Sequence, residues 1–357
     1  MEQENYNVLG VMSGTSLDGV DLAHILFTEN AGKWSFGIRE TATIPYSNDW
    51  IIRLKEAVDH DTPTLDTLDK EYTLLLSGII NEFITGYNLQ GLNAICSHGH
   101  TIQHRPHEGF TLQIGNLPEI ANLTGQKVIC DFRVQDVNLG GQGAPLVPIG
   151  DRLLFNGYRY CLNLGGFSNI SFEDGGQRVA FDICPVNTVL NFYANRLGMD
   201  YDDGGAIAAA GNMIPELMEE LENLPFYSLP YPRSLGFEFV KGTVLPLMEK
   251  HRSADKDKLR TFTEHIARQI AQVIKDTGET GGLLVTGGGA YNTFLINNLR
   301  TLLPQTDICV PDDKTIQFKE ALIFGFLGVL KMRGETNVLG SVTGAYKDHS
   351  AGMIFMP

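Results

Sequence analysis

The sequence predicts an α/β protein of two domains, and three observations lead to this class. The chain has 357 residues, which is more than one hydrophobic core comfortably supports. A turn of small residues follows a predicted strand near the start, and a weaker version of this pattern recurs from Tyr158, as an internal duplication would produce. Later, a helix, a strand, the glycine turn Gly287–Gly289 and another helix follow one another, which is typical of mononucleotide-binding folds.

The first hairpin is predicted from two apolar runs around a loop of small and hydroxyl-bearing residues. Val8–Val11 has the pattern of a strand end, and Val20–Leu26 alternates as a returning strand would. Backbone N–H groups and hydroxyls in such a loop suit a phosphate, and its carboxylates suit an accompanying metal ion. The predicted nucleotide-binding residues here are Gly14, Thr15, Ser16, Leu17, Asp18, Gly19, Val20 and Asp21. An ordinary tight turn, with Gly and Asp used for their backbone preferences, is the alternative.

The remaining elements of the first half follow from residue spacing. Alternation predicts a strand over Trp34–Ile44, and helical periodicity covers Trp50–Val58 and Leu65–Tyr87. Shorter elements are predicted as the strands Ala94–Ser97, Phe110–Ile114 and Val128–Phe132 and the helix Pro118–Thr124. The glycine-rich stretch Gly140–Pro145 favours a domain boundary or hinge nearby, and Gly204 and Gly205 offer further hinge positions.

The second half repeats the strand, turn and strand pattern and then becomes helical. The predicted strands are Tyr160–Leu164, Ile170–Phe172, Val179–Asp182 and Leu283–Thr286, and the predicted helices are Val186–Leu197, Leu259–Ile274, Asn292–Leu303 and Phe318–Leu330. Nucleotide-binding turns are predicted at Gly165, Gly166, Gly287, Gly288 and Gly289. Neither a Walker-type loop nor a dinucleotide fingerprint is present, so a nucleotide would have to be held by the hairpins and the glycine turn.

Charge and composition exclude some classes of partner. Lys and Arg number 27 against 42 Asp and Glu, a net charge of −15, which disfavours nucleic acids and anionic membranes as partners. No basic and apolar leader opens the chain, and no apolar run has membrane-spanning length, so a cytoplasmic protein is expected. The five widely spaced cysteines suggest free thiols. A homodimer and a monomer both stay open.

Several motifs match a known family in order along nearly the whole chain. The strongest are Gly10–Asp21 and Gly140–Pro148. The others are Ser97–Gly99, His104–Pro106, Gln113–Asn116, Asp131–Arg133, Asn163–Gly166, Tyr201–Asp202 with Gly205, Pro232–Gly236, Gly287–Gly289 and Ser341–Ala345. Together they resemble the 1,6-anhydro-N-acetylmuramic acid kinases, which are part of the actin-like, hexokinase-like ATPase superfamily.

The resemblance implies a fold and an activity. It implies two related ribonuclease H-like domains around a central nucleotide and sugar cleft: residues 1–150, completed by 331–357, and residues 151–330, which carry the adenosine-binding turn. The implied reaction uses ATP, with Mg²⁺, to open 1,6-anhydro-N-acetylmuramic acid hydrolytically and to phosphorylate O6. N-acetylmuramic acid 6-phosphate and ADP would be the products, in peptidoglycan recycling. Asp18 and Asp21 are the predicted magnesium-binding acids, and the sequence does not rank one over the other.

Asp182 is the predicted catalytic residue. A carboxylate at the end of a strand, beside a bound phosphate, can take a proton from an attacking nucleophile, and the resemblance implies that this nucleophile is water. The alternative is an N-cap for the helix Val186–Leu197. The family usually has Asp-Thr-Gly-Pro-Gly-Asn where this chain has Asp182-Ile183-Cys184-Pro185-Val186-Asn187. The change leaves two rival functions open: a kinase for a different sugar, and a nucleotide-binding regulator without turnover.

The sugar site is predicted from a histidine-rich segment and one arginine. His98, His100, His104 and His107 lie close together in sequence, which allows a metal site and hence a metal-dependent hydrolase as a remote alternative. More simply, they would line a sugar pocket. Arg133 can bind the lactyl carboxylate of a muramic sugar through its guanidinium fork, or form an ion pair with Asp131 or Asp136. The predicted substrate-binding residues are His98, Thr101, Arg133 and Asn187.

Overall fold

The computed structural model describes residues 3–357, and these form two compact units. Unit 1 contains the chain up to Leu154 together with Phe318–Pro357, and unit 2 contains Phe155–Gln317. The sequence places the second boundary after residue 330, but the polypeptide enters unit 1 at Phe318, inside the helix α13 (Asp313–Arg333). The backbone leaves helical geometry at that residue, with φ −111° and ψ 17°.

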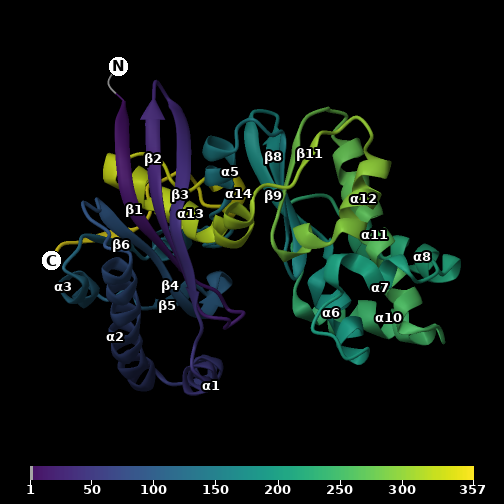
Figure 1. The fold of residues 1–357 in the computed structure, drawn as a ribbon, viewed down its shortest axis with the longest axis horizontal. Helices are drawn as coiled ribbons and strands as arrows, with labels where there is room; N and C mark the ends of the chain where they lie inside the picture. Colours follow the sequence, from purple (N-terminus) through teal and green to yellow (C-terminus); the bar gives the residue numbers. More distant parts are fainter. Residues whose placement is uncertain (1–2) are drawn as a thin grey trace. The chain divides into compact units, whose positions relative to one another are not determined.

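Unit 1 is built from a mixed sheet and flanking helices (Figure 1). Its strands are β1 (Glu4–Ser13), β2 (Val20–Asn30), β3 (Lys33–Ile44), β4 (Ala94–Arg105), β5 (Phe110–Ile114), β6 (Val128–Cys130) and β12 (Met353–Phe355). Its helices are α1 (Asn48–Glu56), α2 (Thr62–Gly86), α3 (Glu119–Thr124), α4 (Val134–Asn138), α5 (Pro148–Leu154), α14 (Gly340–Thr343) and most of α13. Single 3₁₀ turns occupy Ala57–Asp59 and Pro106–Glu108.

The strand order in unit 1 is β12-β6-β4-β1-β2-β3, with β5 paired to β4. The strands β1, β2 and β3 run antiparallel as neighbours, whereas β4 runs parallel to β1 and β6 parallel to β4. The predicted first hairpin is confirmed, with Ser13 opposite Val20 at the last rung before the loop.

Both faces of the unit 1 sheet are covered. Leu9 and Val11 belong to a buried cluster with apolar residues of α2, so α2 covers their face. The residues of β1 that alternate with Leu9 and Val11 face α13. A Cβ at Gly10, which is one of them, would lie 2.1 Å from the carbonyl oxygen of Ala321. The close approach of α13 to β1 therefore requires glycine at position 10.

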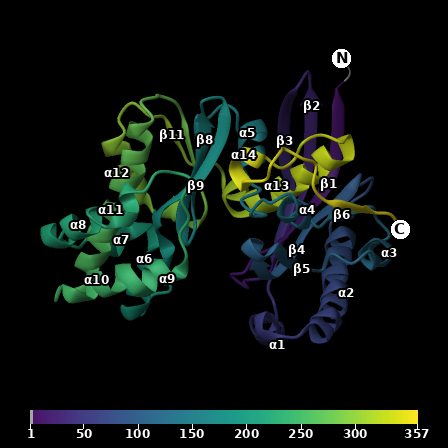
Figure 2. The ribbon, with the colours of Figure 1, turned by 180° about the vertical axis from the view of Figure 1, so that it is seen from behind.

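Unit 2 has a smaller sheet and more helix. Its strands are β7 (Tyr160–Leu164), β8 (Phe167–Asp174), β9 (Gln177–Pro185), β10 (Leu283–Thr286) and β11 (Ile308–Cys309). Its helices are α6 (Asn187–Arg196), α7 (Ala206–Ala209), α8 (Pro215–Glu222), α9 (Phe237–Phe239), α10 (Leu245–Lys250), α11 (Asp255–Asp276) and α12 (Thr293–Leu302). Single-turn 3₁₀ and π segments lie at Asp203–Gly205, Pro225–Ser228, Val240–Val244 and Gly288–Tyr291. The helices α11 and α12 lie side by side (Figures 1 and 2).

The unit 2 sheet repeats the topology of unit 1. Its order is β11-β10-β7-β8-β9. Again three strands pair antiparallel, and two more run parallel to the first of them. If β5 and β12 of unit 1 are set aside, the strands of both units lie in the order third, second, first, fourth and fifth along the sheet. This shared order confirms the predicted fold class of two related α/β domains.

Two strands continue past their predicted ends. Strand β4 continues through His98 to Arg105 because that segment pairs with β5. Strand β9 continues past Asp182 to Pro185, because β8 pairs with it along its whole length. The polar composition of His98–Arg105 hid the first extension from hydrophobic periodicity, whereas the charged Asp182 interrupts the apolar run of β9 before the second.

The cysteines in residues 3–357 are all free thiols. Within the same residues, none of the helices combines the length and apolar character needed to cross a bilayer.

Candidate functional site

The loop between β1 and β2 is a tight turn with exposed hydroxyls. The backbone N–H of Leu17 donates to the carbonyl of Gly14 at 3.2 Å, and Leu17 has φ 63°. Thr15 and Ser16 are exposed, and no hydrogen bond within the described chain is recorded for their hydroxyl groups. Gly19 has φ 150°, and a Cβ there would lie 2.2 Å from the carbonyl oxygen of Ile44. The loop therefore presents free donors on a backbone that its glycines fix.

Not every residue predicted in this loop can reach a ligand through its side chain. Val20 is fully buried in the apolar core of unit 1, whereas Gly14 and Leu17 are half-buried. The hydroxyl and carboxylate residues therefore carry the polar chemistry of the loop.

A buried chain of hydroxyl groups fixes the base of this loop. Ser13 Oγ lies 2.6 Å from the Tyr46 hydroxyl and 2.7 Å from His100 Nδ1, and Tyr46 bonds to the Tyr72 hydroxyl at 2.5 Å. Burial lowers the pKa of His100 to about 4, so the ring is neutral at neutral pH. His100 therefore supports the loop from within the protein.

The two acids of the loop have different surroundings. Asp18 is exposed, and within residues 3–357 its carboxylate forms no hydrogen bond or ion pair. Asp21 is half-buried and accepts a hydrogen bond from Thr43 Oγ1 at 2.6 Å. Burial raises the pKa of Asp21, the charge of Asp18 adds to this, and the Thr43 bond opposes it. Among residues 3–357 there is no group of three or more His, Cys, Asp or Glu arranged to hold a metal ion. Two carboxylates still suit Mg²⁺, which binds through few carboxylates and keeps most of its waters.

Arg133 is held by two contacts within unit 1. Its Nε donates to His98 Nε2 at 2.8 Å, and its Nη1 donates to the carbonyl of Gly143 at 2.6 Å. Burial lowers the pKa of Arg133 to about 10, so the guanidinium keeps its charge at neutral pH. Because Nε is occupied, a carboxylate ligand would have to meet the two terminal nitrogens end-on.

His98 has both ring nitrogens occupied. A guanidinium only donates, so Nε2 of His98 accepts from Arg133, and Nδ1 carries the proton and donates to the carbonyl of Gly99 at 2.9 Å. Burial lowers the pKa of His98 well below its usual range, as does the nearby charge of Arg133. The structure thus places His98 behind Arg133, as a neutral support for the guanidinium.

The glycine-rich stretch Gly140–Pro145 is tied to its surroundings. Asp136 is fully buried and accepts from the backbone N–H of Gly143 at 2.7 Å and from Thr343 Oγ1 at 2.7 Å. The backbone N–H of Gln142 donates to the carbonyl of Thr343 at 2.8 Å. These bonds fix the carbonyl that Arg133 contacts and do not favour a hinge here.

The other residues of the histidine segment are dispersed along β4 and the turn after it. His104 lies on the exposed side, with Nδ1 3.0 Å from Thr111 Oγ1, and Thr101 is half-buried opposite Gln113. His107 is exposed, 3.6 Å from Glu108. The predicted alternative of a histidine metal centre therefore has no support within residues 3–357.

Glu320, which begins the buried apolar stretch of α13, is not among the residues predicted from the sequence. Its side chain reaches solvent, but desolvation by the surrounding protein raises its pKa; the charge of Arg133 opposes this and that of Asp21 adds to it. Glu320 thus interacts with a predicted sugar-binding residue and with a predicted magnesium-binding residue. The charged pair Lys319 and Glu320 at the start of a long apolar run was the available signal.

In unit 2 the two predicted glycine turns lie against each other. A Cβ at Gly287 would lie 2.6 Å from Asn163 Oδ1 and 2.8 Å from the carbonyl oxygen of Leu164, and one at Gly289 would lie 2.7 Å from Leu164 Cβ. Leu164 directly precedes Gly165 and Gly166, so the turn after β10 packs on the turn after β7. Gly288 lies beside Asn187 Nδ2, which also donates to the Leu164 carbonyl at 3.4 Å. Asn187 therefore belongs with the glycine turns.

We expect Gly287→Ala to weaken nucleotide binding about tenfold or more, because the added methyl group must displace backbone of the neighbouring turn, a cost of about 1–3 kcal/mol. Gly287 also has φ 80°, which L residues rarely adopt. Gly176→Ala is the matched control, since Gly176 has φ 82° but open space around it. Calorimetric titration with ADP measures both variants. Equal losses in the two would show that backbone strain alone, and no contact between the turns, explains the effect.

Asp182 lies inside β9 and not at its end, and it is not a helix cap. The helix α6 has Val186 at its N-cap position without a side-chain bond, which excludes the capping alternative. Asp182 Oδ2 accepts from the backbone N–H of Leu235 at 2.8 Å. For Oδ1 no hydrogen-bond partner within the described residues is recorded. Burial raises the pKa of this carboxyl, and the Leu235 bond partly offsets the rise. The arrangement can accept a proton at Oδ1.

The residues in which the Asp182–Asn187 motif departs from the family face the core. Ile183, Cys184 and Val186 are fully buried and belong to the apolar cluster of unit 2. Cys184 contacts Ser168 Oγ at 3.2 Å. The changed side chains therefore fill the interior behind Asp182, where they do not contact solvent or a ligand.

The predicted hinge glycines of unit 2 are also fixed. Thr293 Oγ1 donates to the carbonyl of Gly204 at 2.9 Å, and a Cβ at Gly205 would lie 2.2 Å from Asn292 Oδ1. Both glycines serve the close packing of their turn on α12.

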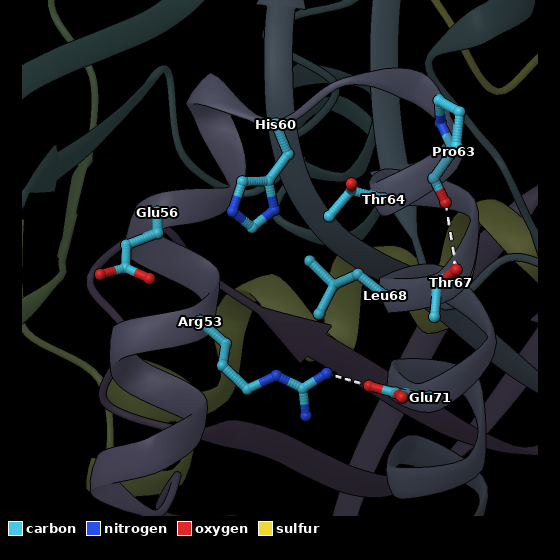
Figure 3. A pocket seen from close by; sticks show the side chains of 8 residues that line it. All are labelled: Arg53, Glu56, His60, Pro63, Thr64, Thr67, Leu68 and Glu71. Atoms are coloured by element: carbon cyan, nitrogen blue, oxygen red, sulfur yellow. Dashed lines mark hydrogen bonds and ion pairs between the residues drawn. The ribbon is translucent and has the colours of Figure 1, made fainter.

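A cavity of about 470 Å³ lies between α1 and the start of α2 in unit 1 (Figure 3). Arg53 and Glu71 form an ion pair at its rim, and His60 and Thr64 lie on the opposite side in Figure 3. None of the residues predicted to bind nucleotide or sugar lines this cavity.

Comparison with known proteins adds three findings. Residues 6–357 match the family model described as anhydro-N-acetylmuramic acid kinase. A protein of that name from Shewanella woodyi is 33% identical over 365 residues, covering 97% of this chain and 98% of its own, and one from Shewanella oneidensis is 35% identical over 360 residues, covering 96% and 97%. A solved structure, the activator of the 2-hydroxyisocaproyl-CoA dehydratase from Clostridium difficile with bound ADPNP, is similar at 14% identity with a TM-score of 0.43, covering 92% of this chain and 97% of its own.

Proposed function

The chain belongs to the anhydro-N-acetylmuramic acid kinase family, and on this premise we propose that it converts 1,6-anhydro-N-acetylmuramic acid, ATP and water into N-acetylmuramic acid 6-phosphate and ADP. The reaction recovers a peptidoglycan sugar. The proposed cellular location is the cytoplasm, where ATP is available.

The observation that supports this reaction best is the state of Asp182. Its carboxylate has one oxygen bonded to Leu235 and the other without a partner recorded in the described chain, and burial makes it a stronger base than an exposed aspartate. A general base needs this combination of a free oxygen, a fixed orientation and a raised pKa.

The proposed reaction combines hydrolysis of the anhydro bridge with phosphoryl transfer to O6. Water attacks the anomeric carbon C1 as Oδ1 of Asp182 accepts one of its protons, and the bond from C1 to O6 breaks. The freed O6 forms a bond to the γ-phosphorus of ATP, and the bond from that phosphorus to the β-phosphate bridging oxygen breaks, releasing ADP. The proton on Asp182 then returns to solvent.

We propose that the loop of Gly14–Asp21 and the two glycine turns of unit 2 bind the phosphates and adenosine of ATP. Thr15 and Ser16 supply hydroxyl donors, and Gly165, Gly166 and Gly287–Gly289 supply close backbone approach. Mg²⁺, when bound with ATP, would be held by Asp18 and Asp21 and would neutralise charge on the transferred phosphoryl group.

We further propose that Arg133 binds the lactyl carboxylate of the sugar through its terminal nitrogens, with His98 as its support and not as a direct ligand. The two rival functions are weakened by the burial of Ile183, Cys184 and Val186. Because these side chains face the core, their change does not alter the surface beside Asp182.

A coupled ADP-release assay tests the proposal. The protein should release ADP with 1,6-anhydro-N-acetylmuramic acid and produce a phosphosugar, with much slower turnover on glucose or N-acetylglucosamine. Faster turnover on another sugar would favour the first rival. Thermal protection by ATP without a phosphosugar from any of these substrates would favour the regulator.

The pH dependence of kcat/KM for the sugar should show an acid limb above the ordinary aspartate value. Asp182 must be ionised to accept a proton, so activity falls as pH drops through its pKa, which burial raises from 3.8. Initial rates between pH 4 and 9 at saturating ATP measure this limb. Full activity maintained down to pH 4 would contradict a raised pKa at Asp182.

A further inference from the structure

The segment from Phe226 to Leu235 folds around one guanidinium in unit 2. Nη1 of Arg233 donates to the carbonyl oxygens of Phe226 at 3.3 Å, Tyr227 at 3.0 Å and Leu229 at 2.9 Å. The rings of Phe226 and Phe181 lie 5.0 and 5.7 Å from the guanidinium carbon. Arg233 therefore holds this segment together. The segment consists of the end of a 3₁₀ turn and the loop after it, and we name it the strap.

The same residue joins the strap to β9 beside Asp182. The backbone N–H of Asp182 donates to the carbonyl of Arg233 at 3.0 Å, and Arg233 Nε donates to the carbonyl of Asp182 at 3.3 Å. Two residues further on, the backbone N–H of Leu235 reaches Asp182 Oδ2 at 2.8 Å. The position of that donor thus depends on the strap that Arg233 organises.

We propose that Arg233 is a positioning residue for Asp182: it holds the strap so that the N–H of Leu235 binds Oδ2 and leaves Oδ1 to receive the proton from water. This inference rests on the proposed function. The Pro232–Gly236 motif thereby gains a role that neither phosphate nor sugar binding supplies.

The hydrogen bond from Leu235 has two physical effects on the carboxylate. It fixes the rotation of the carboxyl group, and it favours the ionised form, since a donor aimed at a carboxylate lowers its pKa. A second titratable group, the thiol of Cys184, interacts with Asp182 from its own strand, and burial raises the pKa of that thiol to about 12. Cys184 therefore stays protonated through the assay range.

Lysine cannot replace the arginine here. Its single ammonium group can neither meet three carbonyls of the strap and the Asp182 carbonyl together nor stack between two rings. A merely structural arginine would also lose stability on substitution, so a readout is needed that stability alone does not move. The acid limb of the pH profile is such a readout.

The experiment compares Arg233→Lys and Arg233→Gln with the control Tyr231→Phe. The Tyr231 ring stacks on Phe181 at 4.8 Å within the same strap, and its hydroxyl bonds Asp174 at 2.8 Å, away from Asp182. Both arginine variants should move the acid limb of kcat/KM upward by about one pH unit and lower kcat at pH 8 about tenfold, since one unit reflects the loss of one good donor. KM for ATP should stay within about twofold. Tyr231→Phe should leave the limb in place.

Two results would overturn the inference: arginine variants that melt earlier but keep the wild-type acid limb, or a limb that moves equally in Tyr231→Phe. If the wild-type protein does not turn over the anhydro sugar, the proposed function fails separately. The pKa of Asp182 is then measured by ¹³C NMR of carboxyl-labelled protein without substrate, with Asp182→Asn for assignment. The Asp182 titration should still shift upward in Arg233→Lys, and no shift would refute the positioning role.

Discussion

Asp182→Asn should lower kcat by about 10²- to 10⁴-fold, the range that a positioned general base contributes. The amide has nearly the same shape and can still accept from the Leu235 N–H, which lies 2.8 Å from Oδ2. It cannot take a proton from water at neutral pH. Steady-state ADP release on the anhydro sugar measures the loss.

Asp174→Asn serves as the control, because Asp174 ends β8 and bonds to the Tyr231 hydroxyl of the strap at 2.8 Å, away from Asp182. This variant should keep wild-type turnover. ADP affinity should be unchanged in both variants. Turnover within threefold of wild type in Asp182→Asn would remove Asp182 from the proposed role and leave the family membership intact.

Arg133→Lys should lower kcat/KM for the anhydromuramic sugar about 10- to 100-fold. The substitution keeps a positive charge but loses the two terminal nitrogens that can meet a carboxylate, and charge-assisted hydrogen bonds contribute about 1.5–3 kcal/mol. The loss should lie mainly in KM, because the contact forms in the ground state as well as in the transition state.

A substrate without the lactyl group separates this contact from general damage. On 1,6-anhydro-N-acetylglucosamine, wild type and Arg133→Lys should have similar kcat/KM, because this sugar offers no carboxylate for residue 133 to bind. In wild type, His98 Nε2 accepts a hydrogen bond from Arg133 at 2.8 Å, and the lysine variant loses this bond. Thermal melting of both proteins measures how much stability that loss costs. An equal loss on both sugars would mean that Arg133 shapes the site without binding the lactyl carboxylate.

The fold was largely predictable because hydrophobic periodicity reports burial directly. The strands β1, β2 and β3 and the helix α11 follow the predicted ranges to within a few residues. Periodicity failed where pairing with another strand overrode composition. The polar residues of β4 beyond Ser97 extend that strand because β5 pairs with them, and no local pattern signals this pairing.

The contacts of the candidate site residues were harder to predict from the sequence than the fold. The sequence predicted that His98 binds the substrate, yet both its ring nitrogens already have partners within the protein. One of these partners is Arg133, 35 residues away in the chain, and no local pattern signals that bond. Glu320 and the Arg233 strap depend on contacts of the same kind. The apparent loss of the family pattern after Asp182 could be interpreted only once Ile183 and Val186 were placed in the core.

The most direct test of the account follows an oxygen atom. Anhydro sugar carrying ¹⁸O in its 1,6 bridge is converted with ATP, and the product is examined by ³¹P NMR. Attack of water at C1 predicts that the label ends in the bond between C6 and phosphorus, seen as an isotope shift of the phosphate resonance. A phosphosugar without that shift, or ADP release without any phosphosugar, would contradict it.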